Sequence, residues 1–234
     1  MKTLTRRICL AVLLFLPPAL QAQTPGLEEV LDRLVVAYGG EENLRKMDSM
    51  VQEWDMVAMM SKKHGSDIRG IEAPDRLMVK LTYPDKVERR MLSGNEGLVA
   101  FNNDHLSMAS DAQRDAMRLQ LMRLYSPLML REKADALTLK IEGGLCALSL
   151  TEHGVQADYL VDMETWRIGK VVGTLVIHGQ SMQFLTEYSD FAFVEDVLVH
   201  RKENKYAGNV NTAMLSLRNV TFDADLDGSG IIAD

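Results

Sequence analysis

The sequence predicts a mainly β protein of the α+β class, in which helices cover the concave face of one curved antiparallel sheet. Short β-like runs follow one another at the spacing typical of a sandwich or barrel, and turn residues such as Gly143-Gly144 separate them. A helical pattern precedes the first strand, and a second one interrupts the strands at residues 111–125. No internal repeat or linker divides the chain, so residues 23–222 are expected to form one domain.

Residues 1–22 have the pattern of a secretory signal peptide. A basic head with Arg6 and Arg7 is followed by an apolar stretch and by small residues before an expected cleavage after Ala22. The apolar stretch is shorter than a membrane span, which argues against the alternative of an uncleaved anchor. The two arginines also resemble a twin-arginine signal, whereas Cys9 lacks the small preceding residue of a lipidated cysteine. We therefore expect export to the periplasm by a cleaved signal peptide.

The mature chain is acidic. Without residues 1–22 it keeps 23 basic against 33 acidic residues, a net charge of −10. Nucleic acids and anionic membrane surfaces attract basic proteins, so neither is an expected partner. Cys146 is the one cysteine that remains, which precludes an internal disulfide, and its apolar surroundings in the sequence predict an inert buried thiol. About 210 residues suffice for one domain with a sizeable core, and we expect a monomer.

The mature chain begins with a helix and a long strand. Apolar residues recur at helical spacing from Leu27 to Tyr38, and Gly39-Gly40 is expected to end this helix. A short turn over residues 41–47 leads into a strand at 50–60. Alternate side chains of a strand share a face, so the apolar face of this strand is predicted to carry Met50, Gln52, Trp54, Met56, Ala58 and Met60.

The remaining strands follow in sequence, with one interruption. The runs are approximately 66–72, 76–83, 87–93, 97–102, 136–142, 145–151, 157–162, 166–177, 181–191, 197–206 and 211–222. The helix at residues 111–125 carries Met117, Leu121 and Leu124 on one side, and Pro127 is expected to end it.

Four sequence motifs occur in order along most of the mature chain. They are the helix end Ala37-Tyr38-Gly39-Gly40 before the long strand, Pro74 to Lys80 with the turn Gly94-Asn95-Glu96-Gly97, Tyr159 to Thr165, and the late segments Glu187 to Phe191 and Leu217 to Val220. Together they resemble periplasmic proteins related to the outer-membrane lipoprotein-sorting carriers, the LolA/LolB-like group. The resemblance implies a half-barrel whose helices form a lid over an apolar cavity that shelters acyl chains. It implies a lipid- or lipoprotein-binding carrier that works with partners in the inner or outer membrane, without catalysis and without a cofactor.

The residue content agrees with such a cavity. Methionine is abundant, at 15 of 234 residues, and its unbranched side chain adapts to irregular apolar shapes. Alternation and helical spacing give the predicted lining: Trp54, Met56, Met60, Leu77, Val79, Leu81, Met117, Leu121 and Leu124. The alternative is that these side chains fill an ordinary core and that the protein is an envelope interaction module. The two functions differ in whether the interior is open or filled.

No catalytic motif is present in the sequence. The five histidines are scattered and do not have the spacing of zinc ligands, and no phosphate-binding loop or hydrolase elbow occurs. The segment 223–234 is expected to be an acidic tail. Its residues Asp223, Asp225, Asp227 and Asp234 match positions of a calcium loop, but a strand precedes them where an EF-hand has a helix, so the tail is the preferred interpretation.

Overall fold

The computed structural model describes residues 24–102, 104–177 and 179–232, and the predicted signal peptide lies outside them. Its helices are α1 (Leu27–Ala37), α2 (Glu41–Leu44), η1 (Arg45–Asp48), α3 (Asp111–Met122), α4 (Pro127–Glu132) and η2 (Ala134–Ala136). Its strands are β1 (Ser49–Ala58), β2 (Lys63–Glu72), β3 (Arg76–Tyr83), β4 (Lys86–Ser93), β5 (Glu96–Phe101), β6 (Ser107–Met108), β7 (Leu137–Glu142), β8 (Leu145–Glu152), β9 (Val155–Asp162), β10 (Arg167–Ile177), β11 (Gln180–Val194), β12 (Val197–Ala207) and β13 (Val210–Phe222).

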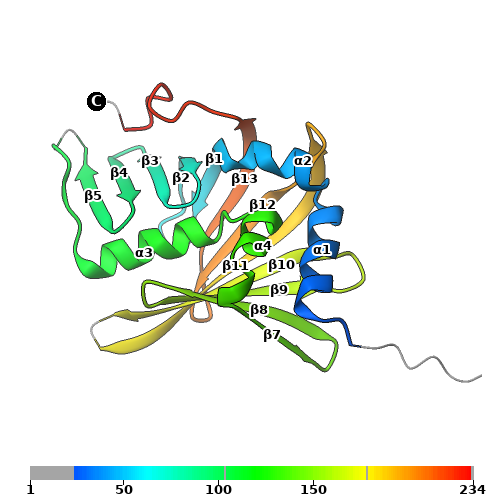
Figure 1. The fold of residues 1–234 in the computed structure, drawn as a ribbon. Helices are drawn as coiled ribbons and strands as arrows, with labels where there is room; N and C mark the ends of the chain where they lie inside the picture. Colours follow the sequence, from blue (N-terminus) through cyan, green and yellow to red (C-terminus); the bar gives the residue numbers. More distant parts are fainter. Residues whose placement is uncertain (1–23, 103, 178, 233–234) are drawn as a thin grey trace, which may run out of the picture.

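The strands form one antiparallel sheet of thirteen strands, which confirms the predicted fold class. Their order is β6-β5-β4-β3-β2-β1-β13-β12-β11-β10-β9-β8-β7, so the first and last long strands are neighbours in its middle. Met50 of β1 pairs with Phe222 of β13. The edge strands β6 and β7 do not pair with each other, and the barrel therefore stays incomplete (Figure 1).

The two helices α3 and α4 belong to the connection between the two edge strands. This connection runs across the concave face of the curved sheet, where α3 packs against β4, β5, β9 and β10 (Figure 1). Ser110 caps α3, because its hydroxyl accepts from the Gln113 amide at 3.3 Å while the Gln113 side chain accepts from the Ser110 amide at 2.8 Å. No helix among the described residues is both long and apolar enough to cross a membrane.

The expected role of Pro127 was wrong. Helix α3 ends at Met122, and Pro127 is the first residue of the separate helix α4. Ser126 caps α4 by accepting from the Met129 amide at 3.2 Å. Proline has no amide hydrogen, and the first turn of a helix does not need one, so proline is favoured at the start of α4.

Glycines bring α3 close to the sheet. A Cβ atom added to Gly173 of β10 would lie 2.2 Å from Cδ1 of Leu119, and one added to Gly97 of β5 would lie 2.7 Å from Cε of Met117. Because these positions have no side chain, the apolar face of α3 rests directly on the backbone of the strands.

The C-terminal segment packs on the other face of the sheet. Leu226 and Ile231 are buried against Met78 of β3, and Gly70 of β2 leaves the space that they occupy. Arg76 forms an ion pair with Asp227 of the same segment. The expected acidic tail thus contributes buried apolar side chains over residues 223–232, which run above β1 to β4 in Figure 1.

The contact between α3 and β10 gives a test of the fold. The substitution Gly173→Ala should lower the free energy of unfolding by about 1–3 kcal/mol, because Leu119 has to move away from the new methyl group. Gly169→Ala on the same strand is the matched control, since its Cβ would meet nothing within 4 Å. Urea unfolding of both variants measures the difference between their free energies of unfolding. Equal urea midpoints for Gly173→Ala and Gly169→Ala would contradict the close packing of α3 on β10.

Candidate functional site

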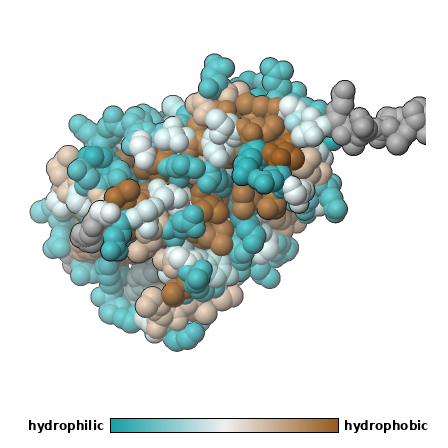
Figure 2. Space-filling model, turned by 90° about the horizontal axis from the view of Figure 1, so that it is seen from below, coloured by the Kyte–Doolittle hydropathy of each residue, from teal (hydrophilic) through white to brown (hydrophobic). Residues whose placement is uncertain are grey.

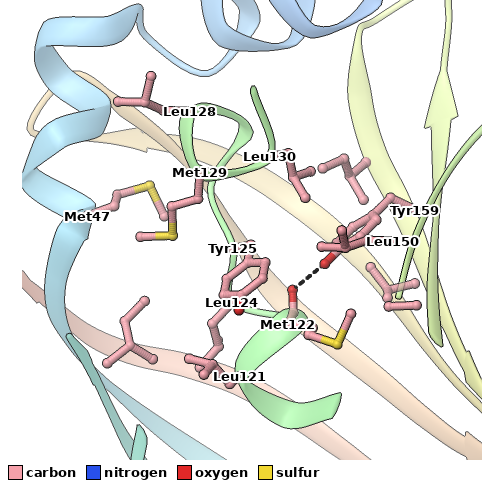
Figure 3. Packing of buried hydrophobic residues seen from close by; sticks show 14 of the residues in the cluster. Met47, Leu121, Met122, Leu124, Tyr125, Leu128, Met129, Leu130, Leu150 and Tyr159 are labelled. Carbon is pink, nitrogen blue, oxygen red and sulfur yellow. Dashed lines mark hydrogen bonds between the residues drawn. The ribbon is translucent and has the colours of Figure 1, made fainter. Parts of the chain in front are cut away.

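The interior lies between the concave face of the sheet and the helices α3 and α4. Side chains from both layers form one buried hydrophobic cluster, part of which Figure 3 shows around the end of α3 and α4. The structure brings five of the predicted lining residues together in this cluster: Leu77, Val79, Met117, Leu121 and Leu124. Met47 of η1, Met122 of α3 and Met129 of α4 join them from the helices, and Met50 joins them from β1.

The other predicted lining residues lie elsewhere. Trp54 and Met56 are buried in a smaller cluster with Leu215, and half-buried Leu81 packs against both clusters. Met60 was assigned wrongly to the interior, because it is 80% exposed. The reason is that β1 ends at Ala58, so the alternation of the strand does not extend to residue 60.

A small cavity of about 40 Å³ lies within the interior. Met47, Met50 and Leu124 contribute apolar side chains to its lining, and Gln52, Arg123 and His200 contribute polar ones. Leu124 is the predicted lining residue that reaches it. One water molecule needs roughly 10–15 Å³ on this measure, whereas ligand pockets measure roughly 300–1,000 Å³. The interior is thus almost filled by side chains in this conformation.

Two tyrosines of the sheet bind the C-terminal end of α3. Tyr159 of β9 donates to the Met122 carbonyl oxygen at 2.8 Å (Figure 3), and Tyr188 of β11 donates to that of Arg123 at 3.2 Å. The last carbonyls of a helix have no partner within the helix, so these hydroxyls replace the water that would otherwise bind them. Burial raises the pKa of both tyrosines, which keeps the hydroxyls protonated as donors.

Arg123 adds a hydrogen bond in which the end of the helix is the donor and the sheet is the acceptor. Its Nη2 donates to the carbonyl oxygen of Phe184 on β11 at 2.9 Å. Three polar contacts with the sheet therefore hold the last turn of α3 over the cavity.

A group of charged side chains is buried beside this apolar interior. Arg69 of β2 donates through Nε to Asp67 at 2.9 Å and through Nη1 to Glu203 of β12 at 2.8 Å. All three side chains are at most 3% exposed. The Arg69 guanidinium also lies 5.1 Å from the centre of the Trp54 ring, and His200 contacts Glu203 at 3.1 Å.

The charges of this group decide the pKa values of its members. Burial raises the pKa of Glu203, but Arg69 and Lys205 outweigh burial and hold the pKa well below its ordinary value of 4.5. Burial and the nearby Arg69 lower the pKa of Lys205 to about 8, although Glu203 lies 3.5 Å from its Nζ. The group therefore contains two carboxylates and two basic side chains, and it is neutral when all four are ionised.

The sequence did not indicate this polar group or the tyrosines. Asp67 and Arg69 alternate along β2 as they would on a solvated face, and their partner Glu203 is 134 positions further along the chain from Arg69. The alternation does place Asp67, Arg69 and Ile71 on one face, but only the pairing of strands shows that this face is inside.

The calcium pattern does not form a site within the described residues. No three His, Cys, Asp or Glu side chains of this part of the chain are placed to hold a metal ion. Asp227 is paired with Arg76, and Asp225 accepts from the Asp227 amide at 3.1 Å. Asp234 lies outside the described residues.

Comparison with known proteins gives a result only at the level of structure. The sequence matches no protein-family model and no curated protein. An outer-membrane lipoprotein-sorting protein domain from Vibrio parahaemolyticus superposes with a TM-score of 0.52 at 8% identity, over 87% of this chain and 95% of that one. A LolA superfamily protein from Nitrosomonas europaea superposes with a TM-score of 0.52 at 11% identity, over 80% of this chain and 94% of that chain.

The chain has the LolA-superfamily fold. At these identities the similarity concerns the fold alone, and it confirms the half-barrel fold that the resemblance implied. In this LolA-like fold, the tyrosine contacts come from β9 and β11, and the charged group lies on β2 and β12.

The tyrosine contacts of the LolA-like fold can be tested singly. Tyr159→Phe should lower the free energy of unfolding by about 0.5–1.5 kcal/mol, because the Met122 carbonyl then keeps only the hydrogen bond from the Tyr125 amide at 3.2 Å. Hydrogen exchange at the end of α3 should become faster. Tyr206→Phe is the control, because that hydroxyl bonds with Glu187 in a part-buried position at 3.3 Å. Unchanged exchange in α3 would contradict the role of Tyr159.

The charged group of the LolA-like fold gives a second prediction. Arg69→Met should lower the free energy of unfolding at pH 7 by about 3–5 kcal/mol, because Lys205 alone then faces the two buried carboxylates of Asp67 and Glu203. The loss should shrink as the pH falls below about 4.5, because Glu203 becomes protonated in the variant, where Arg69 no longer holds its pKa down.

The control for that variant is Arg218→Met. Arg218 pairs with Glu53 at the surface, where an ion pair contributes less than about 1 kcal/mol. Urea denaturation at several pH values gives the free energies of unfolding of Arg69→Met and Arg218→Met. A loss in Arg69→Met that does not depend on pH would show that the buried carboxylates are not its cause.

Proposed function

We propose that the protein is a periplasmic carrier that shelters the acyl chains of a lipid or an acylated protein, without catalysis. The observation that carries this proposal is the apolar, methionine-rich contact between the concave sheet and the helices α3 and α4. Two solved structures with the same fold support it, since one is described as a lipoprotein-sorting domain and the other as a LolA superfamily protein. The signal-peptide pattern of residues 1–22 supports export, with residues 23–222 as the carrier domain and 223–234 as its C-terminal extension.

In this proposal, α3 and α4 act as a lid that moves when a ligand enters. The present cavity of about 40 Å³ is too small for an acyl chain. Unbranched side chains such as Met47, Met117 and Met129 can change conformation between a closed and a filled interior. Each methylene of the ligand that they bury contributes about 0.8 kcal/mol, which offsets the loss of contacts between helix and sheet.

The filled interior also supports a second candidate, an interaction module that binds another envelope protein. Apolar side chains such as Leu145, Val176 and Phe193 are exposed by 61–66%. On the face shown in Figure 2, hydrophobic residues reach the surface in patches separated by hydrophilic ones. The first candidate requires an interior that opens, and the second does not.

Native mass spectrometry of protein purified from a periplasm without detergent distinguishes the two functions. We expect a lipid or fatty acid adduct, with organic extraction identifying its class. Leu124→Asp should abolish the adduct, because a carboxylate at this cavity position opposes an apolar ligand. Leu145→Asp, on an exposed position of β8, should keep it.

A clean ligand-free mass of the wild-type protein, together with no binding of a fluorescent fatty acid, would refute the carrier function. Charge-state distributions in the same spectra show whether the Leu124→Asp protein is folded. If it unfolds, protection of α3 from hydrogen exchange by added fatty acid in the wild-type protein provides the independent measurement.

A further inference from the structure

Arg123 is an interior arginine without a carboxylate partner among the described residues. Its Nη2 donates to the neutral carbonyl of Phe184, and its Nε is enclosed without a hydrogen-bond acceptor in the described part of the chain. Two other arginines of the inner face differ from it in this respect. Arg69 pairs with two buried carboxylates, and Arg90 pairs with Glu88 at 2.6 Å.

The charge of Arg123 is not cancelled by the neighbouring charged group. Two acids, Asp67 and Glu203, already balance the two basic side chains Arg69 and Lys205. Burial lowers the pKa of Arg123, but a guanidinium remains protonated in proteins. Arg123 therefore adds a positive charge next to a group that is already balanced, and a charge that is largely removed from water is costly unless an anion comes to it.

The cavity next to Arg123 is lined by hydrogen-bond donors and by no Asp or Glu side chain among the described residues. The side-chain nitrogen of Gln52 contacts only the Met50 sulfur, at 3.8 Å, and a thioether is a weak acceptor. The Tyr38 hydroxyl accepts from the Ile168 amide at 3.1 Å, so its own hydrogen is available for an acceptor. His200 also lines the cavity.

We infer that the space at the C-terminal end of α3 binds the headgroup of an anionic amphiphile, with a carboxylate or phosphodiester oxygen paired to Arg123. The acyl chain would then extend along the apolar contact between α3 and the sheet, where Leu121 and Leu124 lie. This inference rests on the proposed carrier function and specifies its ligand. A phosphodiester and a carboxylate offer the same chemistry to a guanidinium, namely a singly charged oxyanion that accepts two hydrogen bonds.

Binding of oleate and oleyl alcohol to the mature protein tests the inference, because the two share a chain and differ in the charge of the headgroup. We expect oleate to bind about tenfold or more tightly than oleyl alcohol, measured by displacement of a fluorescent fatty-acid probe. The affinities for phosphatidylglycerol and phosphatidylcholine are then compared in the same assay. This comparison shows whether the protein prefers a phosphodiester with a net negative charge to one whose charge is balanced by the choline group.

Arg123→Gln should remove the preference for oleate while oleyl alcohol still binds, and Arg123→Lys should keep part of it because the charge remains. Arg118→Gln is the matched control. Arg118 lies on the same helix, is buried and donates to a backbone carbonyl, that of Gly94, but does not line the cavity. This variant should retain the full preference.

The outcomes separate the inference from the function on which it rests. Equal affinity of the wild-type protein for oleate and oleyl alcohol would overturn the anionic site and leave the carrier function standing. Failure of both to bind would overturn the carrier function as well. Because the comparison of the two ligands uses the wild-type protein, it stays decisive even if Arg123→Gln does not fold.

Discussion

A curved sheet whose two edges do not meet leaves its concave face open to water, and this chain covers that face with α3 and α4. Both helices come from the connection between the edge strands β6 and β7, so the segment that joins the two ends of the sheet also buries its inner side. Burial of apolar area is the main favourable term in folding. The core, the cavity and the proposed lid therefore occupy the same region of the molecule.

This arrangement places the end of a helix inside the protein, where its carbonyl groups need partners. Tyr159 and Tyr188 supply them from the sheet, and Ser126 caps the following helix within its own sequence. Hydrogen bonds of this kind contribute about 1 kcal/mol each, far less than the apolar contact around them. They fix where the helix ends without making the contact immovable, which is the property that a lid over an apolar interior requires.

The buried charges on the sheet are paired with one another, whereas the arginine at the end of α3 is not paired with a carboxylate among the described residues. Asp67, Arg69 and Glu203 neutralise one another on β2 and β12, whereas Arg123 comes from the helix side and meets only a carbonyl oxygen. A purely structural interior would have little reason to keep an unpaired guanidinium at its cavity. This asymmetry links the proposed carrier function with a ligand that has one charged end and one apolar end.

The sequence by itself determined the long strands, the helices α1 and α3 and the class of fold, because strand and helix periodicity are local properties of the backbone. It placed Leu77, Val79 and the apolar side of α3 in the interior correctly. Its errors lie where a local pattern stops. Met60 follows the end of β1 and is exposed, and Pro127 begins a helix that was expected to end there.

Only the tertiary structure decided which polar residues meet. From the sequence, Asp67 and Arg69 look like residues of a solvent-exposed strand face. In the sheet, the strand order β2-β1-β13-β12 brings Glu203 of β12 next to them. Likewise, the guanidinium of Arg123 meets the carbonyl oxygen of Phe184 only because α3 lies on the sheet. The physical reason is that charge pairing depends on distances between residues far apart in the chain, and periodicity along one strand contains no information about its neighbours.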